Sequence, residues 1–225
     1  MTPRRALYLE EMGLGPVWRL RAEPVASPRA ELGTLGWDEL KCQVAGCTAC
    51  ALHQTRTQAV FGVGDEHADW LFVGEAPGAE EDAQGEPFVG QAGKLLDNML
   101  KSIGLKRGDN VYIANVLKCR PPGNRNPLPE EVAQCQPYLK RQIELIQPKL
   151  IVTLGKFAAQ ALLGQESTIA SLRGKAHTYQ GIPLIVTYHP AYLLRTLPDK
   201  AKAWQDLCLA QETMQRLNSG ASAAI

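Results

Sequence analysis

The sequence predicts an α/β fold, a three-layer α/β/α sandwich built around a central four-stranded parallel sheet. The first observation behind this prediction is a set of four short apolar runs, at residues 70–74, 111–116, 150–154 and 184–188. Runs of this length without polar interruption are typical of strands buried on both faces. The second observation is that segments with helical periodicity lie between or after these runs, at residues 92–103, 129–146, 157–163 and 201–217. Strands and helices that alternate in this way favour a parallel sheet covered on both sides.

The chain divides into an N-terminal extension at residues 1–36 and a domain at residues 37–225. The extension carries a short amphipathic stretch followed by scattered glycines and prolines, and its residues indicate no role. The domain begins at Trp37, where Leu40 and Val44 mark one face of a helix. Pro137 lies inside the predicted helix 129–146, and the missing amide hydrogen bond is expected to kink or end that helix.

The composition is that of an ordinary globular protein that does not coat nucleic acid through bulk charge. Of 225 residues, 45% are hydrophobic and 21% are charged, and the formal net charge is only +1. Any contact with a polyanion must therefore come from local groups of basic residues. There is no run of roughly 18 apolar residues and no apolar segment behind the basic N-terminus, so we expect a cytoplasmic protein without membrane contact.

Three segments of unusual composition follow three of the predicted strands. Residues 75–78 follow the first strand, residues 118–124 the second and residues 189–195 the fourth. In an open parallel sheet, ligands bind outside the carboxyl ends of the strands. The three segments are therefore expected to converge on one site at one edge of the sheet.

The first of these segments continues as a glycine-rich loop from Gly74 to Gly93, in which backbone amides can come close to a ligand. The loop matches neither the Walker phosphate loop nor the dinucleotide-binding pattern, so no nucleotide cofactor is expected. Phe88 lies within it and offers a ring on which a flat base can stack. The alternatives are a surface loop with turn glycines and a phenylalanine that belongs to the core.

Two polar residues at strand ends suit recognition of a pyrimidine. Asn115 ends the second strand, and a fixed carboxamide can donate to a carbonyl while accepting from the adjacent ring N–H, the edge pattern of uracil that cytosine reverses. His189 follows the fourth strand and can hydrogen-bond the oxygen that gathers negative charge as a base leaves its sugar. Taken singly, the asparagine is also typical of a turn, and the histidine of a cap or core position.

Candidate DNA contacts lie in the second and last of these segments. Leu193 and Leu194 can wedge into a base stack if their loop is exposed, and Arg195 can hold a phosphate. Equally, the two leucines can begin a buried segment. Further basic residues that suit phosphate contacts are Lys118, Arg120 and Arg125.

Four cysteines from two distant regions form the most specific single signal in the chain. Cys47 and Cys50 are spaced as a CxxC pair, Cys119 lies after the second strand and Cys135 lies in the helix that follows. Four thiolates suit either a tetrahedral zinc ion or a [4Fe-4S] cluster, and the spacing does not choose between them. The other two cysteines are interpreted as packing residues.

With these features in place, residues 40–215 resemble the family 4 uracil-DNA glycosylases, the iron-sulfur branch of that superfamily. The resemblance rests on GEAPG at 74–78, GEPFVG at 85–90, the segment 115–124 and HPA at 189–191. The resemblance depends on the order of these motifs, on their placement at strand ends and on the presence of the four cysteines.

The resemblance implies a [4Fe-4S] cluster on Cys47, Cys50, Cys119 and Cys135, and a uracil pocket that uses Phe88 and Asn115, with His189 against uracil O2. It also implies that Glu75 and Asn124 join His189 in catalysis and in placing water. Further pocket residues implied by the first motif and the helix after it are Ala76, Gly78 and Glu81. The first family of the superfamily carries an aspartate in this motif, near Ala76, so an aspartate-based mechanism is not expected here.

The resulting functional hypothesis is a monomeric enzyme that flips uracil out of single- or double-stranded DNA and hydrolyses its N-glycosidic bond, leaving an abasic site. The alternative from another class is a non-catalytic, metal-bound nucleic-acid-binding module of a replication or repair complex, which would bind DNA without forming an abasic product. A second alternative is a hydrolase of nucleosides or small phosphoesters, which would act on free nucleoside.

Overall fold

The computed structural model describes residues 32–220, so the predicted amphipathic stretch near the N-terminus lies outside the described residues. The compact unit begins at Leu32, ahead of the boundary predicted at Trp37. Leu32 is buried, and the carbonyl of Leu35 accepts hydrogen bonds from Nε and Nη2 of Arg141. Residues 32–36 therefore pack onto the domain that follows them.

A six-stranded mixed sheet forms the centre of the domain, in the order β1-β3-β2-β4-β6-β5. The inner four strands are parallel, as predicted. They correspond to the four apolar runs and are β2 (Trp70–Gly74), β3 (Val111–Asn115), β4 (Leu150–Leu154) and β6 (Ile182–Thr187). Their residues are almost entirely buried, which explains why continuous hydrophobicity predicted them.

The predicted strand count was too low, because two antiparallel strands extend the sheet at its edges. These are β1 (Val63–Gly64), which pairs with β3, and β5 (Ala176–Tyr179), which pairs with β6. The first has only two residues, and the second alternates between exposed and half-buried side chains. Neither segment carries the apolar run that identifies a buried strand, so both were missed.

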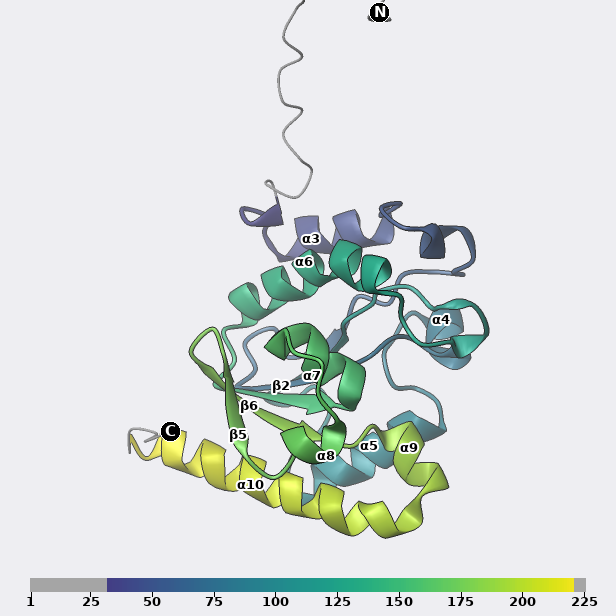
Figure 1. The fold of residues 1–225 in the computed structure, drawn as a ribbon. Helices are drawn as coiled ribbons and strands as arrows, with labels where there is room; N and C mark the ends of the chain where they lie inside the picture. The colour runs from purple at the N-terminus through teal and green to yellow at the C-terminus, as the bar shows by residue number, and fades with distance from the viewer. Residues whose placement is uncertain (1–31, 221–225) are drawn as a thin grey trace, which may run out of the picture. The chain divides into compact units, whose positions relative to one another are not determined.

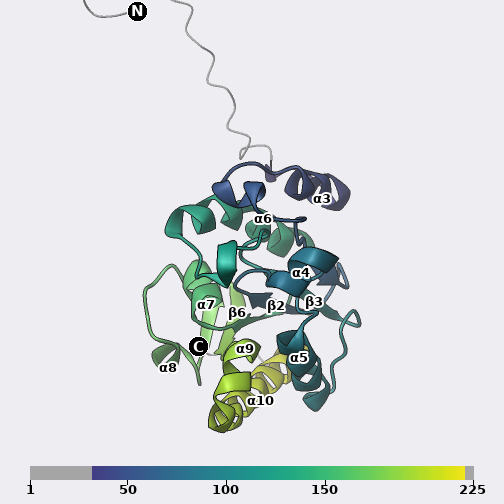
Figure 2. The ribbon, with the colours of Figure 1, turned by 90° about the vertical axis from the view of Figure 1, so that its right-hand side faces the viewer.

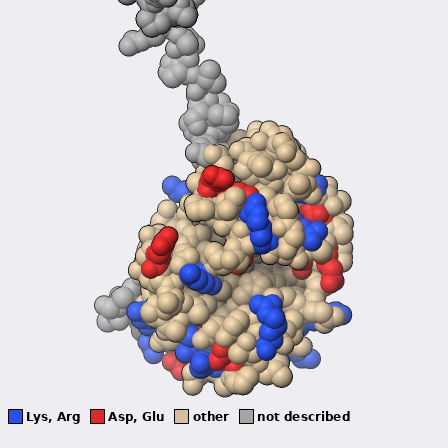
Figure 3. Space-filling model, turned by 45° about the vertical axis from the view of Figure 1, so that its right-hand side comes forward, with Lys and Arg blue, Asp and Glu red and all other residues tan. Residues whose placement is uncertain are grey.

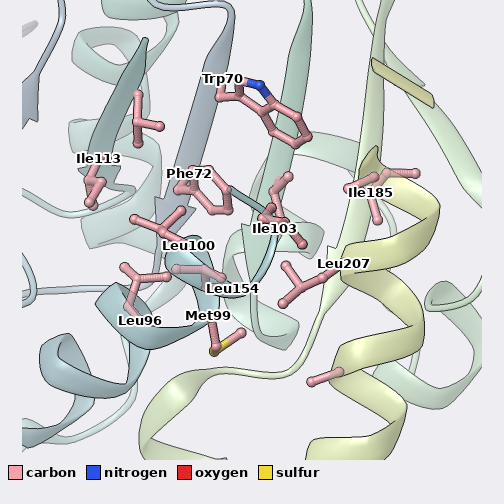
Figure 4. Packing of buried hydrophobic residues seen from close by; sticks show 14 of the residues in the cluster. Trp70, Phe72, Leu96, Met99, Leu100, Ile103, Ile113, Leu154, Ile185 and Leu207 are labelled. Atoms are coloured by element: carbon pink, nitrogen blue, oxygen red, sulfur yellow. The ribbon is translucent and has the colours of Figure 1, made fainter. Parts of the chain in front are cut away.

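Helices cover both faces of the sheet and complete the predicted three layers (Figure 1). One face packs against α5 (Gln91–Ser102) and α10 (Lys200–Asn218), and the other against α6 (Pro129–Ile146) and α7 (Lys156–Leu163). Successive residues of β2 serve opposite layers, because side chains alternate along a strand. Phe72 belongs to the first core and is shown among its neighbours in Figure 4, whereas Leu71 belongs to the second.

The remaining helices are mostly short and lie in the connections. They are α3 (Trp37–Ala45), α4 (Ala79–Gln84), α8 (Ile169–Leu172), α9 (Pro190–Arg195) and the 3₁₀ turns η1 (Ala51–Gln54), η2 (Pro122–Asn124) and η3 (Leu197–Asp199). Helix α6 continues through Pro137 rather than ending there, and Cys135 and Tyr138 on either side of it are buried. Among the helices of residues 32–220, none has the length and apolar character needed to cross a membrane.

The strand order creates a topological switch point between β2 and β4. Strand β3 follows β2 in the chain and pairs on one side of it, whereas β4 pairs on the other side. Crossovers that depart toward opposite sides open a crevice outside the carboxyl ends of the strands between them. Figure 2 looks toward this edge of the sheet and shows α4, α5 and α9 around it.

Candidate active site and cysteine cluster

A cavity of about 640 Å³ opens at the carboxyl ends of the inner strands. Its lining includes Glu75 after β2, Asn115 at the end of β3, Gly155 after β4 and His189 after β6. Figure 3 shows a hollow on this side of the molecule with Lys and Arg side chains around it. A cavity of this volume is suited to a small organic ligand. The predicted convergence of three segments is therefore observed, and the turn from β4 into α7 joins them.

Phe88 and Asn115 meet on the wall of the cavity beside Gly74. A Cβ atom at Gly74 would collide with both Asn115 Oδ1 and the Phe88 ring, so only glycine leaves room for the two side chains. Asn115 is buried, and its Oδ1 has no hydrogen-bond partner within the described structure. An unpaired buried acceptor costs about 1–3 kcal/mol, so this oxygen is available to a ligand that brings an N–H group.

His189 is the N-cap of α9, and this position determines which ring nitrogen carries the proton. The backbone N–H of Ala191 donates to Nδ1 of His189 over 3.1 Å. With Nδ1 used as an acceptor, the neutral imidazole carries its hydrogen on Nε2. Burial, followed by the charge of Arg195, lowers the pKa of His189 to about 4. The side chain is therefore a neutral Nε2–H donor, and its ring centroid lies 5.6 Å from that of Phe88.

Glu75 contributes a titratable carboxyl group to the same cavity. Burial raises the pKa of Glu75 to about 7. The group consequently exists in both protonation states near neutral pH, which is the condition under which a carboxyl group acts well as an acid or a base.

Similarity to known proteins identifies the family of this chain. A family model described as the uracil DNA glycosylase superfamily matches residues 61–208. The type-4 uracil-DNA glycosylase of Archaeoglobus fulgidus is 52% identical over 165 residues, which cover 70% of this chain and 82% of that protein. The type-4 enzymes of Sulfurisphaera tokodaii and Thermotoga maritima are 49% and 48% identical, over 70% and 68% of this chain and 75% and 80% of their own lengths. The chain belongs to the type-4 uracil-DNA glycosylases.

The other predicted pocket residues of this glycosylase all line the cavity, and one of them also holds two loops together. Ala76, Gly78 and Asn124 line the cavity. Glu81 lines it as well, and its carboxylate accepts hydrogen bonds from the backbone N–H groups of Gly78, Val89 and Gly90 at 3.0–3.1 Å. One carboxylate thus ties the first motif to the loop that carries Phe88.

The turn from β4 into α7 is part of the glycosylase cavity and was missed in the sequence. Gly155, Lys156 and Phe157 line the cavity. Gly155 has a φ of 97°, and a Cβ atom there would lie 3.0 Å from Cβ of His189. The sequence offered one clue to these lining residues, which was their position. Strand β4 ends at the same edge of the sheet as the three segments that were recognised.

The three predicted DNA contacts that follow His189 differ in how far their side chains are exposed. Arg195 is exposed and lines the cavity, and Leu194 is 42% exposed. The prediction for Leu193 was wrong, because that side chain is 1% exposed and belongs to the hydrophobic core. The segment is helix α9 rather than an exposed loop, and one helical step directs neighbouring side chains to different sides.

The basic residues after β3 are engaged within the protein. Arg120 Nε donates to Asn124 Oδ1 over 2.7 Å, and Arg125 forms a two-pronged ion pair with Glu131 at 2.6 and 2.9 Å. Both arginines remain partly or fully exposed.

Lys118 is not at the surface, so its predicted phosphate contact is wrong. The side chain is 2% exposed, and Nζ donates to the carbonyl of Asn115 over 2.8 Å and to Gln142 Oε1 over 2.5 Å. Burial lowers the pKa of Lys118 to about 8. The lysine therefore braces the strand end that carries Asn115.

The four predicted cysteine ligands line one small cavity. Arg56 Nη1 donates to Cys119 Sγ over 2.9 Å, and the backbone N–H of Lys118 donates to Cys135 Sγ over 3.1 Å. Burial raises the pKa of the Cys135 thiol, which opposes a free thiolate without a bound cation. The thiols share one space, although residues 32–220 contain no group of three or more His, Cys, Asp or Glu side chains already placed to hold a metal ion.

Proposed function

We propose that this protein excises uracil from single- or double-stranded DNA by hydrolysing the N-glycosidic bond of a flipped deoxyuridine, which leaves an abasic site. The observation that carries the proposal is the meeting of Phe88, Asn115 and His189 in one cavity. The membership of the type-4 uracil-DNA glycosylases supports the same activity.

Asn115 and Phe88 recognise the base. The unpaired Oδ1 of Asn115 accepts from the N3–H group of uracil, while the amide nitrogen donates to uracil O4. Cytosine offers an acceptor at N3 and a donor at its amino group, so both contacts become unfavourable. Phe88 stacks against the flat face of the base, and Ala76, Gly78 and Glu81 shape the surrounding wall.

His189 stabilises the leaving group. As the glycosidic bond breaks, its electron pair moves onto uracil and negative charge collects on O2. A neutral Nε2–H donor aimed at O2 stabilises this charge without transferring a proton. One donor of this kind typically contributes about 3 kcal/mol to the stability of the transition state.

Glu75 and Asn124 place the attacking water. When ionised, Glu75 accepts a proton from the water that attacks the anomeric carbon of the sugar, and its negative charge favours the developing cationic sugar. The uracil anion later takes up a proton from solvent. This assignment uses the carboxyl group of the first motif in place of the aspartate that Ala76 replaces.

Arg195 and Leu194 contact the DNA around the flipped nucleotide. Both are exposed on α9, Arg195 also lines the cavity, and no ion pair engages Arg195 among the described residues. Arg120 and Arg125 provide further phosphate contacts from the segment after β3, with their geometry held by Asn124 and Glu131.

The four cysteines hold a [4Fe-4S] cluster in this proposal. The fit rests on four thiols around one cavity and on donors from Arg56 and Lys118 that already point at two of the sulfurs. When bound, the cluster supplies metal–thiolate bonds that join the segment after α3, the loop after β3 and helix α6. Zinc suits the same four ligands, so metal analysis distinguishes the two.

We also propose that the catalytic domain of residues 37–225 acts as a monomer in the cytoplasm. All six cysteines are free thiols, which suits a reducing compartment.

The deciding experiment is an excision assay on uracil-containing single- and double-stranded oligonucleotides, followed by alkaline cleavage of abasic sites. Strand breaks at the uracil position are expected. Binding without breaks would favour a non-catalytic nucleic-acid module, and release of uracil from free deoxyuridine alone would favour a nucleoside hydrolase.

A further inference from the structure

We propose that Arg107 is a positioning residue for uracil excision, which acts by holding the backbone of Phe88 in the conformation that presents its ring to the base. Arg107 follows α5 and does not line the cavity. The inference rests on the proposed stacking role of Phe88.

Phe88 needs such support because its backbone is strained. Its φ of 56° lies in the left-handed region, which residues with bulky side chains rarely adopt. A strained residue keeps such a conformation only when the surrounding structure enforces it, and this happens most often at functional sites. The groups that enforce the conformation of Phe88 therefore help to determine where its ring lies.

Arg107 binds the two consecutive carbonyl groups that flank this strained position. Nη1 donates to the carbonyl of Pro87 over 2.9 Å, and Nη2 donates to the carbonyl of Phe88 over 2.8 Å. Asp97 holds the guanidinium group from α5, with its Oδ1 3.0 Å from Nε and 2.9 Å from Nη2. A planar guanidinium can bridge two neighbouring carbonyls and a carboxylate at once, which a lysine ammonium cannot do with the same geometry.

The opposite side of the same segment is held as well. A Cβ atom at Gly93 would collide with the carbonyl oxygen of Phe88, so this peptide group lies directly against the first turn of α5. The next two amides, of Val89 and Gly90, donate to Glu81 Oε1. A cation thus binds the carbonyls of residues 87 and 88, and an anion binds the amides of residues 89 and 90.

This arrangement transmits the position of Arg107 to the cavity through the Phe88 backbone. The Phe88 ring is 5% exposed and lies beside Gly74, Asn115 and His189. A shift of the 87–88 peptide groups moves the ring relative to the groups that read and release the base. Because stacking acts on the bound base before and during bond cleavage, losing the clamp is expected to weaken binding more than the chemical step.

The test compares Arg107→Met with a matched control, Arg141→Met, in the full-length protein. Arg141 also donates from two nitrogens to a backbone carbonyl, that of Leu35, and pairs with a carboxylate, that of Glu144, without lining the cavity. Its side chain is 18% exposed, against 23% for Arg107. The two substitutions therefore remove similar interactions at different places.

Three measurements are made on each variant: amide hydrogen exchange of the segment 86–91, inhibition of excision by free uracil, and the separate values of kcat and KM. In Arg107→Met, we expect faster exchange in that segment, weaker uracil inhibition and a rise in KM, the last two by about tenfold, the scale of one lost base-stacking contact. Arg141→Met leaves all three unchanged. Phe88→Leu combined with Arg107→Met is expected to be little worse than Phe88→Leu alone.

Unchanged exchange in Arg107→Met would overturn the clamp itself. Faster exchange with wild-type uracil affinity, or fully additive effects in the double variant, would overturn its role in excision. A wild-type protein that releases no uracil would instead reject the proposed function, and the exchange comparison would still decide whether Arg107 holds the Phe88 backbone.

Discussion

At the scale of single residues, the chemistry of the site depends on where two side chains keep their protons. His189 uses Nδ1 to cap α9, so its proton lies on Nε2 and points away from the helix. Its lowered pKa keeps it neutral above about pH 5, so it donates a hydrogen bond without acting as an acid. Glu75 behaves oppositely, since burial raises its pKa into the neutral range. In the proposed mechanism, the two groups therefore serve different steps of the reaction.

Replacing His189 with alanine should slow excision by about 100-fold to 1,000-fold, the typical cost of removing one hydrogen-bond donor to a developing anion. The measurement is single-turnover release of uracil from a labelled oligonucleotide. Oligonucleotide affinity should change little, since O2 gains most of its charge only as the bond breaks. A rate close to wild type would remove His189 from the mechanism.

The pH dependence of excision should report Glu75 rather than His189. Below about pH 7 the carboxyl group is protonated and cannot accept a proton from water, so single-turnover rates should rise through pH 7 and then level off. Glu75→Gln should be slower and should lose this rise. A wild-type profile that is flat between pH 6 and 8, or an unchanged rise in the variant, would contradict the assignment.

At the scale of elements, the end of β3 is held by the buried ammonium group of Lys118. Lys118 joins the carbonyl of Asn115 to Gln142 on α6, and Gln142 in turn donates to the carbonyl of Phe61. Helix α9 is braced similarly, because Tyr192 donates to Asp199 over 2.6 Å and stacks on Tyr188. The residues proposed to recognise and release the base thus lie on element ends that polar side chains support.

Lys118→Met should destabilise the fold by about 1–3 kcal/mol, because the side chain keeps its length but leaves buried acceptors unpaired. The midpoint of chemical denaturation measures this loss, and KM for uracil-containing DNA should rise because Asn115 is less well held. Lys140→Met, on the exposed face of α6, is the control and should alter neither value. Equal effects of the two substitutions would show that Lys118 has no special supporting role.

At the scale of the whole molecule, the cysteine cavity joins parts of the chain that the sheet does not connect. Cys47 and Cys50 flank the turn after α3, Cys119 follows β3 and Cys135 lies in α6. These segments meet in a hydrophobic cluster separate from the two cores that flank the sheet. A bound cluster would therefore stabilise the fold where the hydrophobic packing of the protein is least extensive.

The purified protein should be brown and should contain iron and acid-labile sulfide in the proportions of a [4Fe-4S] cluster. Cys135→Ser should bleach the protein and lower its melting temperature by about 10 °C, since metal binding contributes to folding and each kcal/mol shifts the midpoint by a few degrees. Cys208→Ser, outside the cavity, is the control. A colourless, zinc-containing preparation with full activity would reject the iron-sulfur proposal.

By itself, the sequence determined the inner strands, the long helices and the edge of the sheet where the site forms. Local patterns suffice for these features, because buried strands need continuous apolar runs and parallel strands end at a common edge. The short edge strands and α9 lack such patterns, and this is why Leu193 was assigned to a loop.

Only the tertiary structure decided what surrounds each charged side chain. Lys118 and Arg107 are ordinary basic residues in the sequence, yet one is buried beneath Asn115 and the other binds the carbonyl groups of Pro87 and Phe88. The physical reason is that burial and pairing depend on which distant segments pack together, whereas residue type and spacing describe only the chain around a position.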